Sequence, residues 1–386
     1  MPAPRTTGSP SECDPARRRK LPGRIVCARV SPPLGGKENN KMNMMVPAIE
    51  GELRRQARVA RRLGSPFVAS VLEAGHRQIG RAPRTAALIE GWPRDPSASA
   101  LAMRFNAALH CLARRGELAE LRALYAREHN DYDGAIGAAL SASDDFIAGW
   151  MESTPQTNEV GRAAAIGAAL MVARHRFGLP FELFELGSSC GLNLNLARYG
   201  YDLGGVIAGV EHSPVQVVPL WTGPAPLPAP IEVAAARGVD LNPLDAGDTA
   251  TRERLLSYVW ADQPGRARRL ERALDMALQY PPRIDRADAA SWLAQRLEER
   301  QQAGLCRVVF HSMVLQYLTA EDRQSVLYAI RTAGARATEA RPLAWISFEW
   351  TPTRSEVHLS LTSWPNGETK RLATCHAYGN WIDWRG

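Results

Sequence analysis

The sequence predicts an α/β fold in which a mostly parallel, doubly wound sheet follows an N-terminal helical domain. From Phe181 onward, short apolar runs alternate with helical segments, and such alternation is typical of a parallel sheet with helices on both faces. Before Phe181, apolar residues recur every three or four positions, which indicates helices. Two strand-like runs around Asn366-Gly367 predict a closing antiparallel hairpin. The expected parts are a tail (1–44), a helical domain (45–155) and an α/β domain (156–386).

Residues 1–44 are rich in Pro, Gly, Ser and Arg and show no apolar period, so we expect them to be disordered. Of the 47 basic and 40 acidic residues of the chain, this segment holds nine and three, which leaves 38 and 37 for the remainder. The net charge of +7 therefore comes mainly from the tail, and nucleic-acid binding by the folded part is not favoured. The basic run Arg17–Lys20 could still contact nucleic acid, and translation could instead start at Met42, Met44 or Met45.

The composition is that of an ordinary globular protein, with 45% apolar and 7% aromatic residues. We find no apolar run long enough to cross a membrane and no signal peptide in the sequence. The six cysteines are scattered without C-x-x-C spacing, which argues against a disulfide framework and against a zinc site. We therefore expect a cytoplasmic protein that holds no metal ion and acts on a small molecule. The sequence leaves the oligomeric state open.

Apolar residues at helical steps define the expected helices of the N-terminal domain, and breakers such as Gly64-Ser65-Pro66 and Gly91-Trp92-Pro93 separate them. Another helix is expected from about Glu159 to Phe177, directly before the first core strand. The helices expected in the N-terminal domain are Glu52–Leu63, Ala98–Arg114, Glu117–Glu128 and Asp144–Met151.

The stretch Phe181–Leu196 reads as a buried strand, a turn of small residues and a helix. Glycine in such a turn lets the backbone approach a ligand closely, and a helix N-terminus directs N–H groups toward it. The pattern E-x-G-x-x-x-G-x-N differs from the dinucleotide pattern G-x-G-x-x-G, and the glycines could also serve packing alone. The candidate cofactor-binding residues here are Glu185, Gly187, Ser188, Ser189, Gly191 and Asn193.

Further strands and helices alternate after this stretch. A short hairpin is expected from 206–210 and 215–220, and Thr319 is the expected N-cap of a helix. Trp381 and Trp384 are expected to cover the end of the core. The other expected elements are strands at 231–240, 283–288, from 306 and at 342–350, helices at 249–278, 289–302 and 320–333, and a closing hairpin of 357–363 and 370–376.

Two acids fall at the expected carboxyl ends of core strands. Asp240 follows the second core strand, where an acid can accept both ribose hydroxyls of a nucleoside cofactor. The alternative is that Asp240 stabilises the following turn, since Asp is a common turn former. Asp288 follows the third core strand and could serve as the N-cap of the next helix. The glycine turn resembles that of class I S-adenosylmethionine methyltransferases, and this resemblance implies instead an acid that faces the adenine amino group.

The fourth core strand is expected to end at His311 and Ser312, with Gln316 and Tyr317 just beyond. Ligands of doubly wound sheets bind at the carboxyl ends of the strands, so Gln316 and Tyr317 are candidate substrate contacts. His311 is a candidate general base because an imidazole titrates near neutral pH, or it is a hydrogen-bonded structural residue. Adjacent residues of a strand point to opposite faces, which argues against a Ser–His nucleophilic pair.

The polar segment Gln156–Arg162 precedes the last helix before the core. Thr157 or Asn158 could act as its N-cap. Because this helix is expected to pack on the sheet, Gln156, Asn158 and Arg162 are candidate contacts to a substrate or cofactor.

Five separated strings resemble, in order, the bacterial domain-of-unknown-function family DUF2332. They are Q-T-N-E-V-G-R (156–162), G-S-S-C-G-L-N-L (187–194), R-G-V-D-L-N-P-L-D (237–245), H-S-M-V-L-Q-Y-L (311–318) and the closing H-A-Y-G-N-W-I-D-W. The resemblance covers roughly residue 50 to the end. Ser189 and Cys190 stand where the family usually has alanines, and both are still small residues.

The turn after the first strand also resembles motif I of class I S-adenosylmethionine methyltransferases, and their sheet adds an antiparallel hairpin to a Rossmann-like core. This resemblance implies a methyltransferase that holds S-adenosylmethionine through the residues of the glycine turn, Asp240 and Asp288. The alternative is a non-catalytic nucleoside-binding or regulatory protein on the same scaffold. The sequence does not reveal the substrate.

Overall fold

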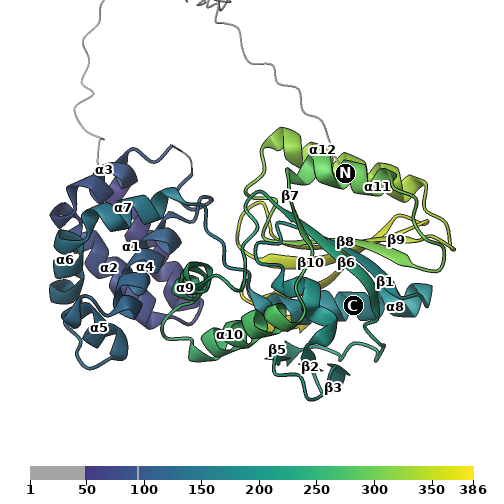
Figure 1. Cartoon of the computed structure of the whole chain (residues 1–386), viewed down its shortest axis with the longest axis horizontal. Helices are drawn as coiled ribbons and strands as arrows, with labels where there is room; N and C mark the ends of the chain where they lie inside the picture. Colours follow the sequence, from purple (N-terminus) through teal and green to yellow (C-terminus); the bar gives the residue numbers. More distant parts are fainter. Residues whose placement is uncertain (1–47, 94) are drawn as a thin grey trace, which may run out of the picture. The chain divides into compact units, whose positions relative to one another are not determined.

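The computed structural model describes residues 48–93 and 95–386 (Figure 1). The expected disordered tail, its basic run and the alternative starts lie outside the described residues. Between residues 48 and 152, the described residues form seven α-helices, as the apolar periodicity predicts for this part of the chain. They are α1 (Ala48–Arg62), α2 (Pro66–Gln78), α3 (Pro83–Glu90), α4 (Leu101–Arg115), α5 (Ala119–Ala126), α6 (Tyr132–Ala142) and α7 (Asp144–Glu152).

Helices α2, α3 and α6 are additional to the four expected ones. The breaker Gly64-Ser65-Pro66 both ends α1 and starts α2, because Ser65 is the N-cap and accepts the Val68 N–H at 3.4 Å while Pro66 occupies the first helical position. The helices enclose one apolar core built around Phe105, Leu109 and Ile136. Trp260 and Tyr378, from much later in the chain, complete this core.

A short 3-10 turn (Val160–Arg162) leads into α8 (Ala163–Phe177), an alanine-rich helix that is buried along most of its length. The prediction of Thr157 or Asn158 as the N-cap was wrong. Glu159 is the N-cap of the 3-10 turn, and its side chain accepts the Gly161 N–H at 2.9 Å.

The α/β part contains a nine-stranded, mostly parallel sheet in the order β5-β12-β11-β10-β9-β8-β1-β6-β7. The five strands β7, β6, β1, β8 and β9 are parallel, and β10 and β11 add the expected antiparallel pair. The strands are β1 (Phe181–Leu186), β5 (Leu220–Thr222), β6 (Val233–Asp240), β7 (Ile284–Arg286), β8 (Cys306–Ser312), β9 (Leu343–Trp350), β10 (Val357–Trp364), β11 (Glu368–Cys375) and β12 (Trp381–Trp384).

Helices cover both faces of this sheet (Figure 1). Alternation along the strands directs Leu183 and Phe310 into a core with α8 and α10 (Pro264–Gln279), and Phe184 and Val309 into a core on the other face. Helices α11 (Ala289–Glu298) and α12 (Ala320–Ala335) form that second core. Thr319 is the N-cap of α12, as predicted, and accepts the Asp322 N–H at 3.0 Å.

The register places the carboxyl ends of the core strands side by side. Leu186 of β1 lies opposite Val239 of β6 on one side and His311 of β8 on the other. Strand β1 thus separates β6 and β7 from β8 and β9, so the strand order reverses at β1 and β8. This point of reversal is where open α/β sheets form a crevice.

The expected hairpin at 206–210 and 215–220 was wrong. Strand β3 (Val206–Gly209) pairs with β2 (Gly200–Leu203) instead, β4 (Gln216–Val217) joins them, and β5 belongs to the large sheet. The reason is the Gly204-Gly205 turn, because both residues have positive φ, of 69° and 93°, as tight two-residue hairpins require.

Three other expectations need correction. The segment after the glycine turn is a 3-10 helix, η3 (Leu192–Arg198), whose Leu192 and Leu196 carbonyls accept the hydroxyls of Tyr199 and Tyr201. The long helix at 249–278 is two helices, α9 (Thr249–Tyr258) and α10. The closing tryptophans form a further strand, β12, in which Trp384 packs in the core as expected, whereas Trp381 is 39% exposed.

Candidate functional site

A cavity of about 1160 Å³ lies at the carboxyl ends of β1, β6, β7 and β8 and is bounded by α1, α2 and α4. Pockets that bind small molecules typically have volumes of this order. All predicted site residues except Ser188, Gly191 and His311 line it. The lining ones are Gln156, Asn158, Arg162, Glu185, Gly187, Ser189, Asn193, Asp240, Asp288, Gln316 and Tyr317.

The N–H groups of the turn after β1 are bonded within the protein. Those of Cys190 and Leu192 donate to Asn158 Oδ1 at 3.2 and 3.1 Å, and that of Ser189 donates to Asp240 Oδ2 at 2.8 Å. The N–H groups of Ser188 and Gly191 donate to backbone carbonyls. The expectation that N–H groups of this turn point at a ligand is therefore not met for residues 188–192. The following helix, η3, is also short, with seven residues.

The side chains of the same turn present oxygen atoms that have no partner among the described residues. These are Glu185 Oε2, Ser189 Oγ and Asn193 Oδ1, from side chains that all line the cavity and belong to residues at most 5% exposed. Burial, and next the negative charge of Asp240, raise the pKa of Glu185 well above its ordinary value. Buried polar atoms are nearly always hydrogen-bonded, so three in one cavity indicate a place for donor groups of a ligand.

Asp240 and Asp288 line the cavity and also fulfil the structural roles that we considered for them. Asp240 Oδ1 accepts the Asn242 N–H at 2.8 Å, so the carboxylate supports the turn after β6 as well as the one after β1. Asp288 is the N-cap of α11 and accepts the Ser291 N–H at 2.9 Å. A carboxylate accepts more than two hydrogen bonds, so both retain capacity for a ligand.

The segment Gln156–Arg162 connects the loops at the ends of several strands, and we call it the strap. Gln156 donates to Asn242 O beyond β6 at 2.8 Å, and Asn158 accepts the two N–H groups after β1. Arg162 donates to Ser312 O at the end of β8 at 3.1 Å and to Ala377 O beyond β11 at 2.9 Å. The residues predicted to contact a ligand thus also organise the edge of the sheet.

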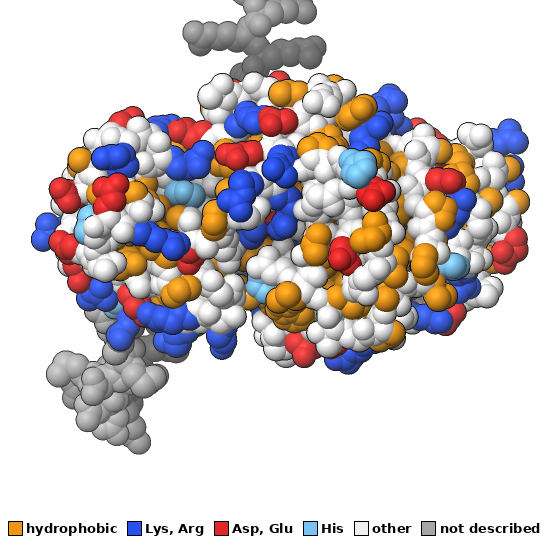
Figure 2. Space-filling model, turned by 90° about the horizontal axis from the view of Figure 1, so that it is seen from below, with side chains coloured by type: hydrophobic (Ala, Val, Ile, Leu, Met, Phe, Trp, Pro, Cys, Tyr) orange, Lys and Arg blue, Asp and Glu red, His pale blue; other side chains and the backbone are white. Residues whose placement is uncertain are grey.

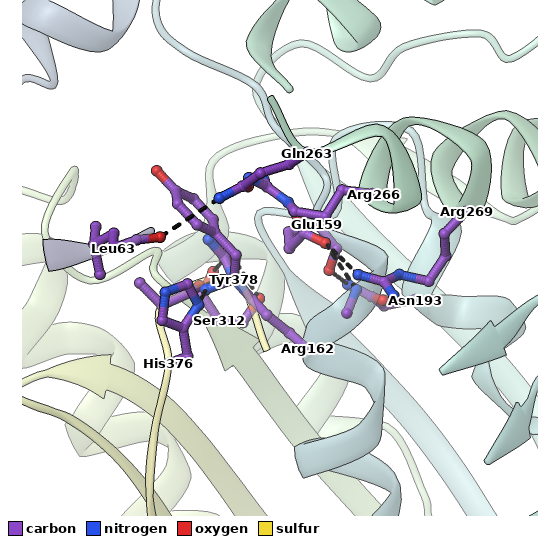
Figure 3. A network of polar contacts seen from close by, with 12 residues as sticks. Leu63, Glu159, Arg162, Asn193, Gln263, Arg266, Arg269, Ser312, His376 and Tyr378 are labelled. Atoms are coloured by element: carbon purple, nitrogen blue, oxygen red, sulfur yellow. Dashed lines mark hydrogen bonds and ion pairs between the residues drawn. The ribbon is translucent and has the colours of Figure 1, made fainter. Parts of the chain in front are cut away.

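Glu159 of the strap forms a buried ion-pair network with α10 (Figure 3). Its carboxylate accepts the Arg266 Nε–H at 2.9 Å and lies 3.8 Å from Arg269, and Arg266 stacks 3.9 Å from the ring centroid of Tyr378. Burial opposes ionisation, but the two arginine charges and the Gly161 N–H hold the pKa of Glu159 below its ordinary value. The network fixes the strap against α10 and the 376–378 turn.

His311 lies outside the cavity. Its side chain is fully buried, its Nδ1 lies 2.7 Å from Glu349 Oε1, and its Nε2 accepts the Trp345 indole N–H at 2.9 Å. Glu349 Oε1 also accepts the Val314 and Leu315 N–H groups, at 2.9 and 3.3 Å. Because both ring nitrogens are in use on the α12 side of the sheet, the arrangement gives His311 a structural role.

Gly191 and Ser188 also face the protein rather than the cavity. A Cβ on Gly191 would come 2.7 Å from Pro282, and its φ of +69° favours glycine. The Ser188 hydroxyl donates to Glu185 O at 3.0 Å. Both residues therefore shape the turn from behind, and Gly187 is the glycine of the turn that lines the cavity.

Several lining residues were not predicted. Arg254 of α9 and Arg354 of the turn after β9 lie in segments without a recognisable motif, so no signal in the sequence singles them out. His376 and Tyr378 stand in the closing string, which indicates only packing. Burial, and next the charge of Arg266, lower the pKa of His376 to about 4, so its imidazole is neutral at pH 7.

Within residues 48–93 and 95–386, no cluster of three or more His, Cys, Asp or Glu side chains could hold a metal ion. None of the helices in the same ranges has the length and apolar character needed to span a bilayer. Figure 2 shows Lys and Arg side chains gathered near the middle of one face, among acidic and apolar ones.

Comparison with protein families is decisive for the family of this chain. The model of DUF2332, described as an uncharacterised protein conserved in bacteria, matches residues 50–384. The chain belongs to DUF2332. The strap, the turn after β1, Asp240, Asp288 and the 376–378 turn all lie within the matched range of DUF2332. Comparisons with curated proteins and with solved structures gave no match.

Proposed function

We propose that the cavity binds S-adenosylmethionine and that the protein is a methyltransferase acting on a small molecule. The observation that carries this proposal is the chemistry of the turn after β1. Its N–H groups at 188–192 are used internally, while Glu185, Ser189 and Asn193 carry buried oxygens that have no partner in the described part of the chain. Such a turn suits a cationic ligand with amino and hydroxyl donors better than the pyrophosphate of a dinucleotide, which needs N–H donors.

The strand order supports a nucleoside ligand. Numbered along the chain, the parallel core strands run third, second, first, fourth and fifth across the sheet, which is the Rossmann-like order of doubly wound folds. The cavity lies where this order reverses, the usual ligand position of such sheets. Only part of the antiparallel end fits the methyltransferase resemblance, since β10, β11 and β12 form a three-stranded meander rather than a hairpin alone.

The lining residues fit the groups of this cofactor. Glu185 with Asn193 and Ser189 would hold the amino acid part through its ammonium group. Asp240, at the end of β6, would accept the ribose hydroxyls, and Asp288 would face the adenine amino group. Each of these side chains lines the same cavity, and each offers acceptor atoms where the cofactor carries donors.

When bound, S-adenosylmethionine supplies a methyl group on a good leaving group, so the chain needs little acid–base machinery. The protein contributes orientation and exclusion of water. The strap and the network of Glu159, Arg266 and Tyr378 hold the walls in place, and α1, α2 and α4 cover the cavity from the other side. His311 has no part in this mechanism.

A non-catalytic nucleoside-binding protein is the second candidate. One observation favours it: apart from the acids at the strand ends, two cavity-lining side chains that could take up a proton, His376 and Glu159, are engaged in the protein. His376 Nδ1 accepts the Tyr378 N–H at 3.2 Å, and Glu159 pairs with Arg266. An acceptor that must lose a proton on methylation would therefore find few free bases among the described lining residues.

Calorimetric titration with S-adenosylmethionine and S-adenosylhomocysteine tests the proposal. We expect both to bind, and Asp240→Ala to weaken binding at least tenfold, because the ribose hydroxyls lose a charged acceptor worth about 1.5–3 kcal/mol. Asp245→Ala, an exposed acid in the same loop, is the matched control and should bind as the natural protein does. No heat from either ligand at high protein concentration would refute the proposal.

Transfer of a radiolabelled methyl group separates the two candidates. A methyltransferase should label material in the small-molecule fraction of a cell extract. Binding of the cofactor without labelling of any fraction would instead support the non-catalytic protein.

A further inference from the structure

The charged groups that line the cavity are unevenly distributed. The acceptor groups Glu185, Asp240 and Asp288 lie at the ends of β1, β6 and β7. Arginines line it elsewhere: Arg162 of the strap, Arg254 of α9, Arg354 beyond β9 and Arg62 of α1. The acid Glu356 also lines this part, and its carboxylate lies 2.8 Å from His358 Nε2. A cationic cofactor would occupy the acceptor wall and leave the arginines to a second ligand.

Arg162, Arg254 and Arg354 have no carboxylate partner among the described residues. Arg162, although only 7% exposed, donates to the carbonyls of Ser312 and Ala377 and to the Ser312 hydroxyl. Arg254 lies 5.0 Å from the ring centroid of Trp150 and donates to Thr154 O at 3.4 Å. Arg354 donates only weakly, at 3.4 Å, to Gln316 Oε1.

Tyr317 connects two of these arginines. The charges of Arg162 and Arg354 act on its hydroxyl, together with those of Arg104 and of the acid Glu349. Tyr317 and Gln316 line the same cavity as Arg162 and Arg354. Glu159, the only acid of the strap, forms its ion pair with Arg266, and the charges of Glu159 and Glu349 act on Arg162 without forming a salt bridge to it. Buried or half-buried guanidinium groups without acids are well suited to bind an anionic oxygen group of a ligand.

The helical side of the cavity includes an apolar part. Leu63 directly after α1, Val68 and Leu72 of α2 and Met103 of α4 line it, and Trp260 adds an aromatic side chain. These residues offer no charge to a ligand, and burying a hydrocarbon group against them is favourable.

We infer that the second ligand, the methyl acceptor, is a small carboxylic acid with an apolar body. Its carboxylate binds at Arg162, Arg254 and Arg354 beside Tyr317, and its body lies against α1, α2 and α4. A carboxylate fits better than a phosphate ester, because the turn N–H groups that phosphates favour are occupied and the acceptor wall opposes a second negative charge. The inference rests on the proposed function only in calling the second ligand a methyl acceptor. The binding site for a carboxylic acid does not depend on that function.

The test uses 3-phenylpropionate as the probe, with 3-phenylpropionamide as its uncharged analogue and 2-phenylethyl phosphate as the phosphate arm. Binding to the full chain is measured by saturation-transfer NMR and calorimetry, with and without S-adenosylhomocysteine. We expect the acid to bind at least tenfold more tightly than the amide and the phosphate. Arg354→Gln and Arg254→Gln should each weaken binding of the acid about tenfold, since each removes a charge-assisted hydrogen bond.

Arg252→Gln is the matched control, because Arg252 lies on the same helix as Arg254 and pairs with Asp275. It should leave binding of the acid unchanged. Equal binding of acid and amide, stronger binding of the phosphate, or indifference to both cavity substitutions would overturn the inference. Binding of S-adenosylhomocysteine without the acid would leave the proposed function standing, and binding of the acid alone would refute the function but not the site.

Discussion

Glu185 is the residue whose environment most strongly indicates a ligand. It is 3% exposed, its Oε2 has no partner among the described residues, and its neighbour Asp240 is also acidic. A buried carboxyl group in such surroundings destabilises the folded protein once it ionises. A cationic ligand would relieve this cost, so the strain at Glu185 favours binding.

Glu185→Gln should therefore change stability and affinity in opposite directions. Because the pKa of Glu185 is raised in the folded state, the folded state binds this proton more tightly than the unfolded state does, and the proton stabilises the fold at low pH. This contribution to stability is lost as the pH rises from the ordinary carboxyl range through the raised pKa. The variant lacks that loss. In urea denaturation between pH 5 and pH 8, the free energy of unfolding of the variant should rise relative to that of the natural protein, by up to about 1.4 kcal/mol per pH unit.

The same substitution should weaken binding of S-adenosylmethionine about tenfold, since an amide does not neutralise an ammonium group. Glu298→Gln, on the exposed surface of α11, is the control for both measurements. A stability difference that does not vary with pH would show that Glu185 has an ordinary pKa.

The positions of Asp240 and Asp288 could be predicted from the sequence because strand ends follow from the hydrophobic pattern. Their structural roles were also foreseen, since Asp is a common cap and turn residue. Arg254 and Arg354 could not be foreseen, because an arginine in a helix or turn reads as a solvated side chain until the fold brings it to a cavity.

At the scale of elements, the strap does most to shape the site. It carries few apolar groups between α7 and α8, yet its polar side chains hold the loops after β1, β6, β8 and β11. Its sequence suggested contacts to a ligand, because unexplained polar residues near a sheet edge often serve one. Which loops they bind depends on pairings more than 30 residues apart, which a local pattern does not contain.

Asn158→Ala should loosen the turn after β1. The change leaves the buried Cys190 and Leu192 N–H groups without an acceptor, at a cost of about 1–3 kcal/mol for each. Asn158 also has a φ of 38°, which alanine tolerates less well. Hydrogen exchange at Cys190 and Leu192 should accelerate, and the urea midpoint should fall.

Asn158→Asp is the conservative variant, because it keeps the acceptor oxygen and the tolerance for positive φ. It should restore most of the protection at both amides. Unchanged exchange in the alanine variant would show that the strap does not hold the turn.

At the scale of the whole molecule, the parallel core and its helices were predictable and the enclosure of the cavity was not. Alternation of strands and helices suffices to indicate a parallel sheet. The core of the first seven helices, however, includes Trp260 and Tyr378 from the α/β part. Asp262 also accepts the Ser65 hydroxyl and the Phe67 N–H, at 2.5 and 3.2 Å. These long-range contacts place α1, α2 and α4 over the strand ends.

The acceptor wall, the arginines and the helical cover line one cavity, in which we propose that a cationic nucleoside and an anionic partner bind. The measurement that tests this account most directly is a crystal structure of the protein with S-adenosylhomocysteine. The account predicts its ribose hydroxyls within hydrogen-bond distance of Asp240 and its amino group beside Glu185. A cavity without the ligand at saturating concentration, or a ligand bound elsewhere on the chain, would contradict it.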